Sequence, residues 1–386
     1  MDNVKTEVAK YGDYAKELRR YFRMYPEIGG EEYQTQQKIL SELAALGMEA
    51  RPAAGTGVIA TIKGKAPGST VALRCDIDAL PIQDEIDKPY RSKIGGRCHA
   101  CGHDAHIAIV LTAARVLSTL DLAGDVRLLF QPSEEKFPGG ALAMIEDGAM
   151  TGVDAVLGAH VWQPFKTGTV GISFGRTMAS PDEFTIVIQG KGGHGSMPHH
   201  TVDPILIGAQ IVLALKMIVG SNVDPLEQAV VSVGMFKAGE VFNIIPDTAT
   251  IKGTVRTFDQ QLRMSIFEKI ESIASGMCQA SGASFTIDKF FGYPPVINDC
   301  PTAEVVFKAA VDTLGQSQVF EMGPLMAAED FSYYQQQAPG AFMFIGAGDP
   351  EQGLLYPHHH PKFDINEDAL CIGAEVMVRS VLQLLR

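Results

Sequence analysis

The sequence predicts an α/β protein with a second, smaller α+β domain inserted into it, and three observations lead to this prediction. Short apolar runs typical of buried strands alternate with helical stretches in both terminal parts of the chain, as in a layered α/β domain with a mainly parallel sheet. In the middle of the chain, apolar and polar residues alternate as in a half-exposed antiparallel strand. The length of 386 residues also indicates two domains, at roughly 150 residues per domain.

The first predicted element is an amphipathic helix over residues 4–22, where apolar side chains recur every three or four positions. Pro26 and the Gly29-Gly30 pair end this helix. The remaining elements of the α/β domain are predicted as buried strands at 71–73, 126–130, 155–159 and 341–345, and a helix at 106–120.

The inserted domain is predicted from the element order in the middle of the chain. This order is strand 183–189, helix 204–219, strand 229–235, strand 248–256, helix 260–281 and strand 284–288. The β-α-β-β-α-β order is the ferredoxin-like pattern. Because the α/β pattern resumes after Pro294-Pro295, we expect residues 1–177 and 292–386 to form the larger domain and residues 178–291 the inserted one.

Composition excludes several classes of protein. A formal net charge of −13 disfavours nucleic acid as a partner, because binding a polyanion requires a concentrated basic surface.

We expect no membrane-spanning segment, since no run looks long and apolar enough. The charged residues 1–20 lack the apolar core of a secretory signal, so we expect a cytoplasmic protein. Its six cysteines are irregularly spaced and are expected to be thiols or metal ligands.

Residues with metal-binding chemistry follow the predicted strands. The segments 74–81 and 131–135 and the residue His160 come directly after buried runs, and the segment 98–106 precedes a helix. Ligands gather at the carboxyl ends of strands in open α/β sheets, so these residues are expected to converge. A thiolate with imidazoles and carboxylates suits zinc, with manganese, cobalt or nickel as alternatives. The adjacent Glu134 and Glu135 can divide labour, one holding a metal while the other removes a proton from water.

Each of these features has a plainer interpretation. A lone Glu-Glu pair is usually solvated surface, and His160 by itself is compatible with a hydrogen-bonded core histidine. The spacing Cys98-x-x-Cys101 also occurs in redox pairs and in half of a zinc knuckle, although no second such pair completes a structural site. Asp76 and Asp78 are compatible with a capping role or with orienting metal ligands.

Two further groups of histidines are candidates for function. The run 358–360 is compatible with a solvated turn, but we expect at least one of its three imidazoles to bind metal. The glycine-rich tract 190–198 is weak as a phosphate loop, because no Lys-Ser/Thr pair follows it in the expected order. His194 in this tract is therefore expected to face a substrate.

Together these motifs resemble the M20 family of metallopeptidases and amidohydrolases, specifically its aminoacylase-like, hippurate-hydrolase-like and auxin-conjugate-hydrolase branch. The resemblance covers nearly the whole chain. It is carried by the segments 74–81, 101–104, 131–135, 159–161, 192–198, 243–246, 329–331 and 359–361. The segment 135–140 departs from the glycine-rich version common in this branch.

The resemblance implies a catalytic α/β domain that binds two divalent metal ions per subunit, zinc or manganese first, and an inserted lid domain that mediates dimerisation. The metal ligands that it implies are Cys101, His103, Glu135, His160 and His359, with the Cys101 thiolate replacing the bridging aspartate of other branches. Glu134 is then the general base and Asp78 the aspartate beside the metals. Asp76 stands where related peptidases have a ligating histidine, which argues against a typical aminopeptidase.

The same resemblance implies a metal-dependent amidohydrolase that cleaves N-acyl amino acids and acts as a homodimer or larger homo-oligomer through the lid. His194 is expected to stabilise charge on the scissile carbonyl across the dimer, and Asn243 and Arg256 to hold the substrate carboxylate. One alternative is a dipeptidase or carboxypeptidase. Another is a non-catalytic dimeric binding protein, which the joint presence of every ligand and the general base disfavours.

Overall fold

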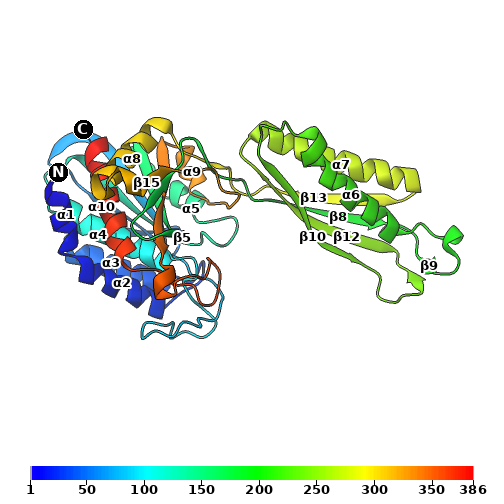
Figure 1. Ribbon diagram of the computed structural model, residues 1–386, viewed down its shortest axis with the longest axis horizontal. Coiled ribbons are helices and arrows are strands. Elements are labelled where there is room, and N and C mark those ends of the chain that lie inside the picture. Colours follow the sequence, from blue (N-terminus) through cyan, green and yellow to red (C-terminus); the bar gives the residue numbers. More distant parts are fainter. Residues whose placement is uncertain (1, 386) are drawn as a thin grey trace. The chain divides into compact units, whose positions relative to one another are not determined.

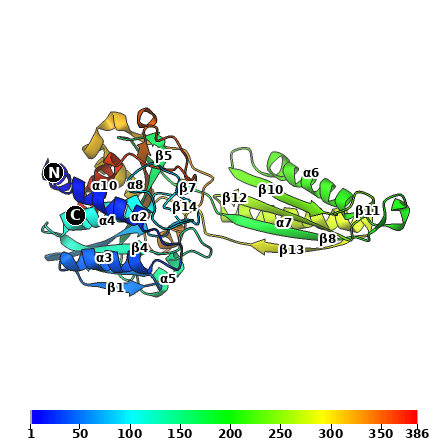
Figure 2. The same cartoon turned by 90° about the horizontal axis from the view of Figure 1, so that it is seen from below.

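The computed structural model describes residues 2–385, and the chain divides into two compact units. The larger unit comprises residues 1–177, 297–323 and 330–386, and the smaller unit comprises residues 178–296 and 324–329. The chain passes between the units at β7 (Arg176–Met178) and β14 (Val296–Ile297), and again on either side of residues 324–329. Each unit is built on its own sheet (Figures 1 and 2).

The larger unit has an eight-stranded sheet in the order β1-β2-β4-β3-β5-β16-β6-β15. Its strands are β1 (Ala50–Ala53), β2 (Gly57–Ile62), β3 (Ala66–Asp76), β4 (Ala123–Gln131), β5 (Ala155–Lys166), β6 (Val170–Ile172), β15 (Val319–Glu321) and β16 (Gly340–Gly348). The four central strands β4, β3, β5 and β16 run parallel. Antiparallel pairs flank them at β1-β2, β2-β4 and β6-β16. The predicted α/β fold is thus confirmed, with the parallel strands concentrated at the centre.

Helices cover both faces of this sheet. They are α1 (Asp2–Ala9), α2 (Gly12–Met24), α3 (Tyr33–Ala45), α4 (His103–Leu117), α5 (Ala141–Glu146), α8 (Cys300–Leu314), α9 (Ser332–Gln335) and α10 (Asp368–Leu384). On β16, Ile345 packs against Gly373 of α10, and Phe342 packs against Phe331 beside α9. Because these strand positions are an odd number of residues apart, their side chains point to opposite faces. The helices α4 and α8 both pack against α10 on the first face.

The first predicted helix is two helices in the structure. The α-helical pattern breaks between Ala9 and Gly12, and the amide of Tyr11 donates to the carbonyl of Val8 in a tight turn. Glycine is a poor helix former, which favours a break at this point. The apolar stripe continues across the break, since Val8 and Ala15 are both buried, so the amphipathic pattern was correct although the single helix was not.

The smaller unit contains β8 (Asp182–Gln189), α6 (Pro204–Asn222), β10 (Ala229–Ala238), β12 (Thr248–Thr257), α7 (Gln260–Ser281) and β13 (Ser284–Phe290) in the predicted order. These strands form an antiparallel sheet in the order β10-β12-β8-β13. Both helices lie on one face of it (Figure 1). A short two-stranded sheet pairs β9 (Gly193–His194) with β11 (Ile244–Ile245). This sheet order is that of a ferredoxin-like fold.

One described helix, α6, is long and apolar enough to cross a bilayer by length and composition alone. The expectation that no run meets this test was therefore wrong. Core helices of water-soluble proteins pass the same test, and α6 carries a buried stripe that includes Ile207, Ile211 and Leu215. This stripe packs against the four-stranded sheet and α7.

Candidate metal centre

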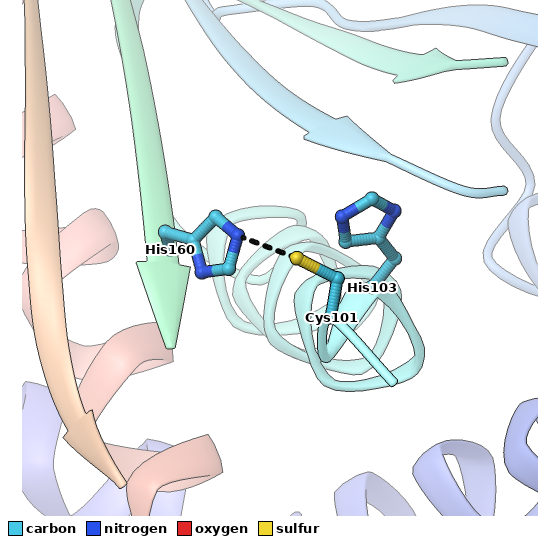
Figure 3. A group of neighbouring side chains, drawn as sticks. All are labelled: Cys101, His103 and His160. Carbon is cyan, nitrogen blue, oxygen red and sulfur yellow. Dashed lines mark hydrogen bonds between the residues drawn. The ribbon is translucent and has the colours of Figure 1, made fainter. Parts of the chain in front are cut away.

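A glycine turn at the start of α4 brings two of the predicted ligands together. Gly102 has φ of +92°, and a Cβ at this position would lie 2.5 Å from Cγ2 of Val161. Only glycine meets both conditions without strain. The helix begins at His103, one turn earlier than predicted, and Cys101 lies two residues before it (Figure 3). The turn therefore places the thiol and the imidazole next to the parallel strands.

His103 is oriented by Asp78 and has a free ring nitrogen. Its Nδ1 lies 2.9 Å from the carbonyl oxygen of Asp78 and 3.2 Å from the Oδ1 of the same residue. The N–H therefore points at Asp78, an arrangement typical of metal-ligating histidines. Its Nε2 is buried and has no hydrogen-bond partner within residues 2–385. A buried unpaired nitrogen is costly, so this atom fits the role of a metal ligand.

His160 faces Cys101 from the neighbouring strand. Its Nδ1 lies 2.7 Å from the carbonyl oxygen of Val161, which directs the N–H to the backbone. Its Nε2 lies 3.4 Å from the Sγ of Cys101 (Figure 3). We expected the strand to end before His160, but β5 continues to Lys166 because β16 pairs with it beyond this point.

The Glu134-Glu135 pair follows β4 in a loop attached to Asp78. The amide of Glu135 donates to Oδ2 of Asp78 at 3.0 Å. Oε1 of Glu135 lies 3.1 Å from Nε2 of His359 and 3.9 Å from Nε2 of His103. Glu134 is only 9% exposed, and its carboxylate lies within 4.8 Å of ligand atoms of both His103 and Glu135. Both acids thus lie near His103, and Glu135 also lies beside His359.

The three consecutive histidines take different environments. His359 has φ of +64°, and its amide donates to the carbonyl of Ala100 at 2.8 Å, which ties its loop to the Cys101 loop. His358 stacks on Trp162, with ring centroids 4.6 Å apart, and its Nε2 lies 3.0 Å from the carbonyl of Val161. His360 stacks on Tyr356 and accepts a backbone hydrogen bond. His359 is the member of the run that faces the carboxylate of Glu135.

The structure brings all five residues proposed as ligands into two groups that share Cys101. One group is Cys101, His103 and His160, and the other is Cys101, Glu135 and His359. Within each group the ligand atoms lie within 4.8 Å of one another. Soft thiolate and imidazole donors beside a carboxylate fit a borderline divalent cation. The larger unit therefore contains a candidate metal-binding site, and Cys101 belongs to both groups of side chains.

The electrostatics of the site also favour cations. Burial, together with Glu135 and Glu134, raises the pKa of the Cys101 thiol well above its usual value. Burial opposes protonation of His103, but Asp76, Asp78 and Glu135 raise its pKa to about 10. The His103 shift reflects the surrounding carboxylates, and the Cys101 shift reflects burial first and the two glutamates second. A divalent cation held by these residues would supply positive charge and favour the thiolate form of Cys101.

The scaffold beneath the ligands joins Asp76 to His106 and Arg74, two residues to which the sequence analysis gave no individual role. Asp76 accepts hydrogen bonds from Nδ1 of His106 at 2.6 Å and from Nη1 of Arg74 at 3.0 Å. Burial opposes ionisation of Asp76, but His103, His106 and Arg74 hold its pKa well below its usual range. Arg74 also donates to Asp330 at 2.9 Å. Arg74 and Asp330 are 256 positions apart, so no local sequence pattern signals this pair.

The remaining predicted site residues lie in the smaller unit. His194 is exposed on β9, and its Nδ1 accepts a hydrogen bond from the amide of Ser196 at 3.1 Å. Asn243 lies beside it, because its carbonyl accepts from the amide of Gly195 and the next residue, Ile244, pairs with His194. Arg256 donates to the hydroxyl of Thr254 near the other end of β12. At ~3.3 Å per residue, Asn243 and Arg256 are too far apart to hold one small carboxylate within a subunit.

Comparison with known proteins decides the family. Residues 72–383 match peptidase family M20/M25/M40. The chain belongs to this family. An N-acyl-L-amino acid amidohydrolase of Geobacillus stearothermophilus is 46% identical over 301 residues, which are 77% of this chain and 80% of that protein. An N-acetyl-L-cysteine deacetylase of Bacillus subtilis is 41% identical over 95% of this chain and 87% of its own length. The chain is therefore a member of a hydrolase family.

Two further relatives bear on the substrate and the metals. Thermostable carboxypeptidase 1 of Saccharolobus solfataricus is 39% identical over 97% of this chain and 96% of its own length. The crystal structure of the Bacillus subtilis YXEP protein, a dinuclear metal-binding peptidase of the M20 family, has a TM-score of 0.84 and 34% identity. It covers 98% of this chain and 99% of its own. The fold of the M20 family is thus shared along the whole chain.

Proposed function

We propose that this M20 family member hydrolyses the amide bond of N-acyl amino acids, such as N-acetyl or N-benzoyl amino acids, with water activated by two divalent metal ions. The observation that carries the proposal is the pair of ligand groups joined at Cys101, with Glu134 beside them. Two relatives are named for this reaction or for the removal of an acetyl group from N-acetyl-L-cysteine.

Cys101, His103, Glu135, His160 and His359 would hold the metals, with zinc or manganese first and cobalt or nickel as alternatives. When bound, such a pair lowers the pKa of water and polarises the amide carbonyl. Glu134 takes the proton of the attacking water and later gives it to the leaving amine. Glu134 is only 9% exposed, which limits competition from bulk water for its carboxylate. A general base must also lie within hydrogen-bonding reach of the proton that it removes.

Asp78 positions two of the proposed ligands, His103 and Glu135. It orients the ring of His103 and accepts a hydrogen bond from the amide of Glu135. On the substrate side, His194 of a second copy of the chain stabilises, across the dimer, negative charge that develops on the scissile carbonyl. Asn243 lies next to it and is the better placed partner for the substrate carboxylate. Arg256 is half-buried, and its guanidinium is engaged with Thr254.

The test is a substrate panel run before and after removal of metal. N-acetyl and N-benzoyl amino acids and small peptides are incubated with the purified protein, and release of free amino acid is measured. We expect turnover of acyl amino acids that a chelator abolishes and that zinc or manganese restores. Metal-dependent turnover of peptides alone would replace this function with that of a carboxypeptidase or dipeptidase, the activity in the name of the Saccharolobus relative. Chelator-insensitive turnover would contradict the metal mechanism.

We further propose that the protein is a homodimer or a larger homo-oligomer through the smaller unit. Leu206, Leu213 and Met217 on α6 are 60%, 71% and 62% exposed, and β10 is an edge strand of its sheet. Exposed apolar helix faces and open strand edges are typical of interfaces. Leu213→Glu is expected to convert the oligomer into a monomer in light scattering coupled to size-exclusion chromatography. A monomeric wild-type protein would refute the proposal.

A further inference from the structure

Ser133, the residue before Glu134, has an unfavourable backbone conformation. Its φ is +56°, and within residues 2–385 only Ala54 and His359 are also non-glycine residues with positive φ. Two of these three residues therefore adjoin or belong to the metal centre. L-residues avoid this region because of the Cβ. Such a conformation persists only where the surroundings hold it, and it clusters at functional sites.

A buried carboxylate holds Ser133 in this conformation. Oε1 of Glu32 accepts the amide hydrogen of Ser133 at 2.8 Å, over a separation of 101 positions. Oε2 of the same residue accepts from the amide of Gly30 at 2.7 Å and from the hydroxyl of Thr56 at 2.6 Å. Glu32 is 0% exposed. Both of its oxygens are thus committed to donors, and one of them holds the loop that carries the two glutamates.

The segment that contains Glu32 also fits closely against this loop. A Cβ on Gly29 would lie 3.1 Å from Cα of Ser133 and 3.4 Å from Oδ2 of Asp78. The same Oδ2 accepts the amide hydrogen of Glu135. Gly29 therefore packs against Ser133 at one end of this segment and against the Asp78 carboxylate that binds its other end. Glu32 fixes its first residue, and Asp78 fixes its last.

We propose, on the basis of the function proposed above, that Glu32 is a positioning residue for the general base. It holds the backbone of Ser133 in the left-handed region, which directs the carboxylate of Glu134 toward His103 and Glu135. Glu32 itself does not touch the metals or the substrate. A purely structural role at the start of α3 would instead stabilise the fold without controlling the geometry of Glu134. The two roles can be distinguished, because only the positioning role predicts that a second substitution at Ser133 restores activity.

Glu32→Leu is the decisive substitution. It keeps a side chain of similar length but removes both acceptor oxygens, so the amides of Ser133 and Gly30 both lose their partner. We expect kcat to fall by about 10- to 100-fold, with KM and bound metal close to those of the wild type. Adding Ser133→Gly to this variant is expected to restore kcat, because glycine adopts positive φ without the help of Glu32. A structural role at α3 predicts no such rescue.

Glu27→Leu is the matched control. Glu27 lies in the same segment, and its carboxylate accepts from the amides of Gln34 and Thr35 in α3 but not from Ser133. We expect this variant to keep the kcat of the wild type. Ser133→Val provides a second route if Glu32→Leu does not fold, because a β-branched residue resists positive φ with Glu32 intact. It is expected to lower kcat as Glu32→Leu does.

Thermal unfolding and metal content are measured for every variant. Wild-type kcat in Glu32→Leu, or failure of Ser133→Gly to restore it in a folded protein with bound metal, would overturn the proposal. So would wild-type kcat in Ser133→Val. Glu134→Gln separates the two levels of inference. If that variant loses turnover while Glu32→Leu does not, the positioning role alone fails. If Glu134→Gln keeps full turnover, the general-base mechanism itself fails.

Discussion

Replacing Cys101 with alanine is expected to abolish hydrolysis, with a loss in kcat of more than about 1,000-fold, because one sulfur belongs to both groups of ligands. Its removal leaves His103 with His160 and Glu135 with His359, which are two incomplete pairs. We therefore expect both metals to be lost together rather than one. Metal content after gel filtration, measured by mass spectrometry, checks this prediction alongside turnover.

Cobalt provides a direct readout of the thiolate. A thiolate bound to Co²⁺ gives a charge-transfer absorption in the near ultraviolet, which overlaps the emission of tryptophan. The chain has one tryptophan, Trp162, and its ring centroid lies 5.6 Å from that of His160. Cobalt is therefore expected to quench Trp162 in the wild type and not in Cys101→Ala. Cys98→Ala is the control, since Cys98 is a buried thiol in neither ligand group. Wild-type absorption in Cys101→Ala would remove the thiolate from the site.

Glu134→Gln is expected to lower kcat by about 100- to 10,000-fold, the range typical of a general acid-base residue, while both metals stay bound. The amide is nearly the same size as the carboxylate but cannot accept the proton of the attacking water. Since Glu134 is absent from both groups that contain Cys101, its loss should leave the ligands intact. Single-turnover kinetics and metal analysis of the same sample check both halves of the prediction.

The neighbouring Glu135→Gln variant is the matched comparison. Glu135 lies 3.1 Å from His359 and shares a ligand group with Cys101. We expect this variant to lose metal, and added metal is expected to restore part of its turnover. If Glu134→Gln lost metal and Glu135→Gln kept it, the two glutamates would exchange roles.

The sequence by itself determined the α/β class, the positions of the central strands, the element order of the smaller unit and the set of chemistry-bearing residues. These features are local. Buried strands are short apolar runs and helices have a fixed period. The residues with thiol, imidazole and carboxylate side chains are read directly from the sequence. The motifs also identified the family. The same pattern placed the start of α4, which begins at His103, to within one helical turn.

Only the tertiary structure decided how those residues cooperate, because contacts over long separations leave no local signal. It placed the Glu135 carboxylate beside His359, the one of the three adjacent histidines that the family resemblance implied. It divided the ligands into two groups that meet at Cys101. It also placed the buried carboxylate of Glu32 against Ser133, 101 positions away. The sequence supplied the donors, and the packing of the loops around the parallel strands determined which atoms face one another.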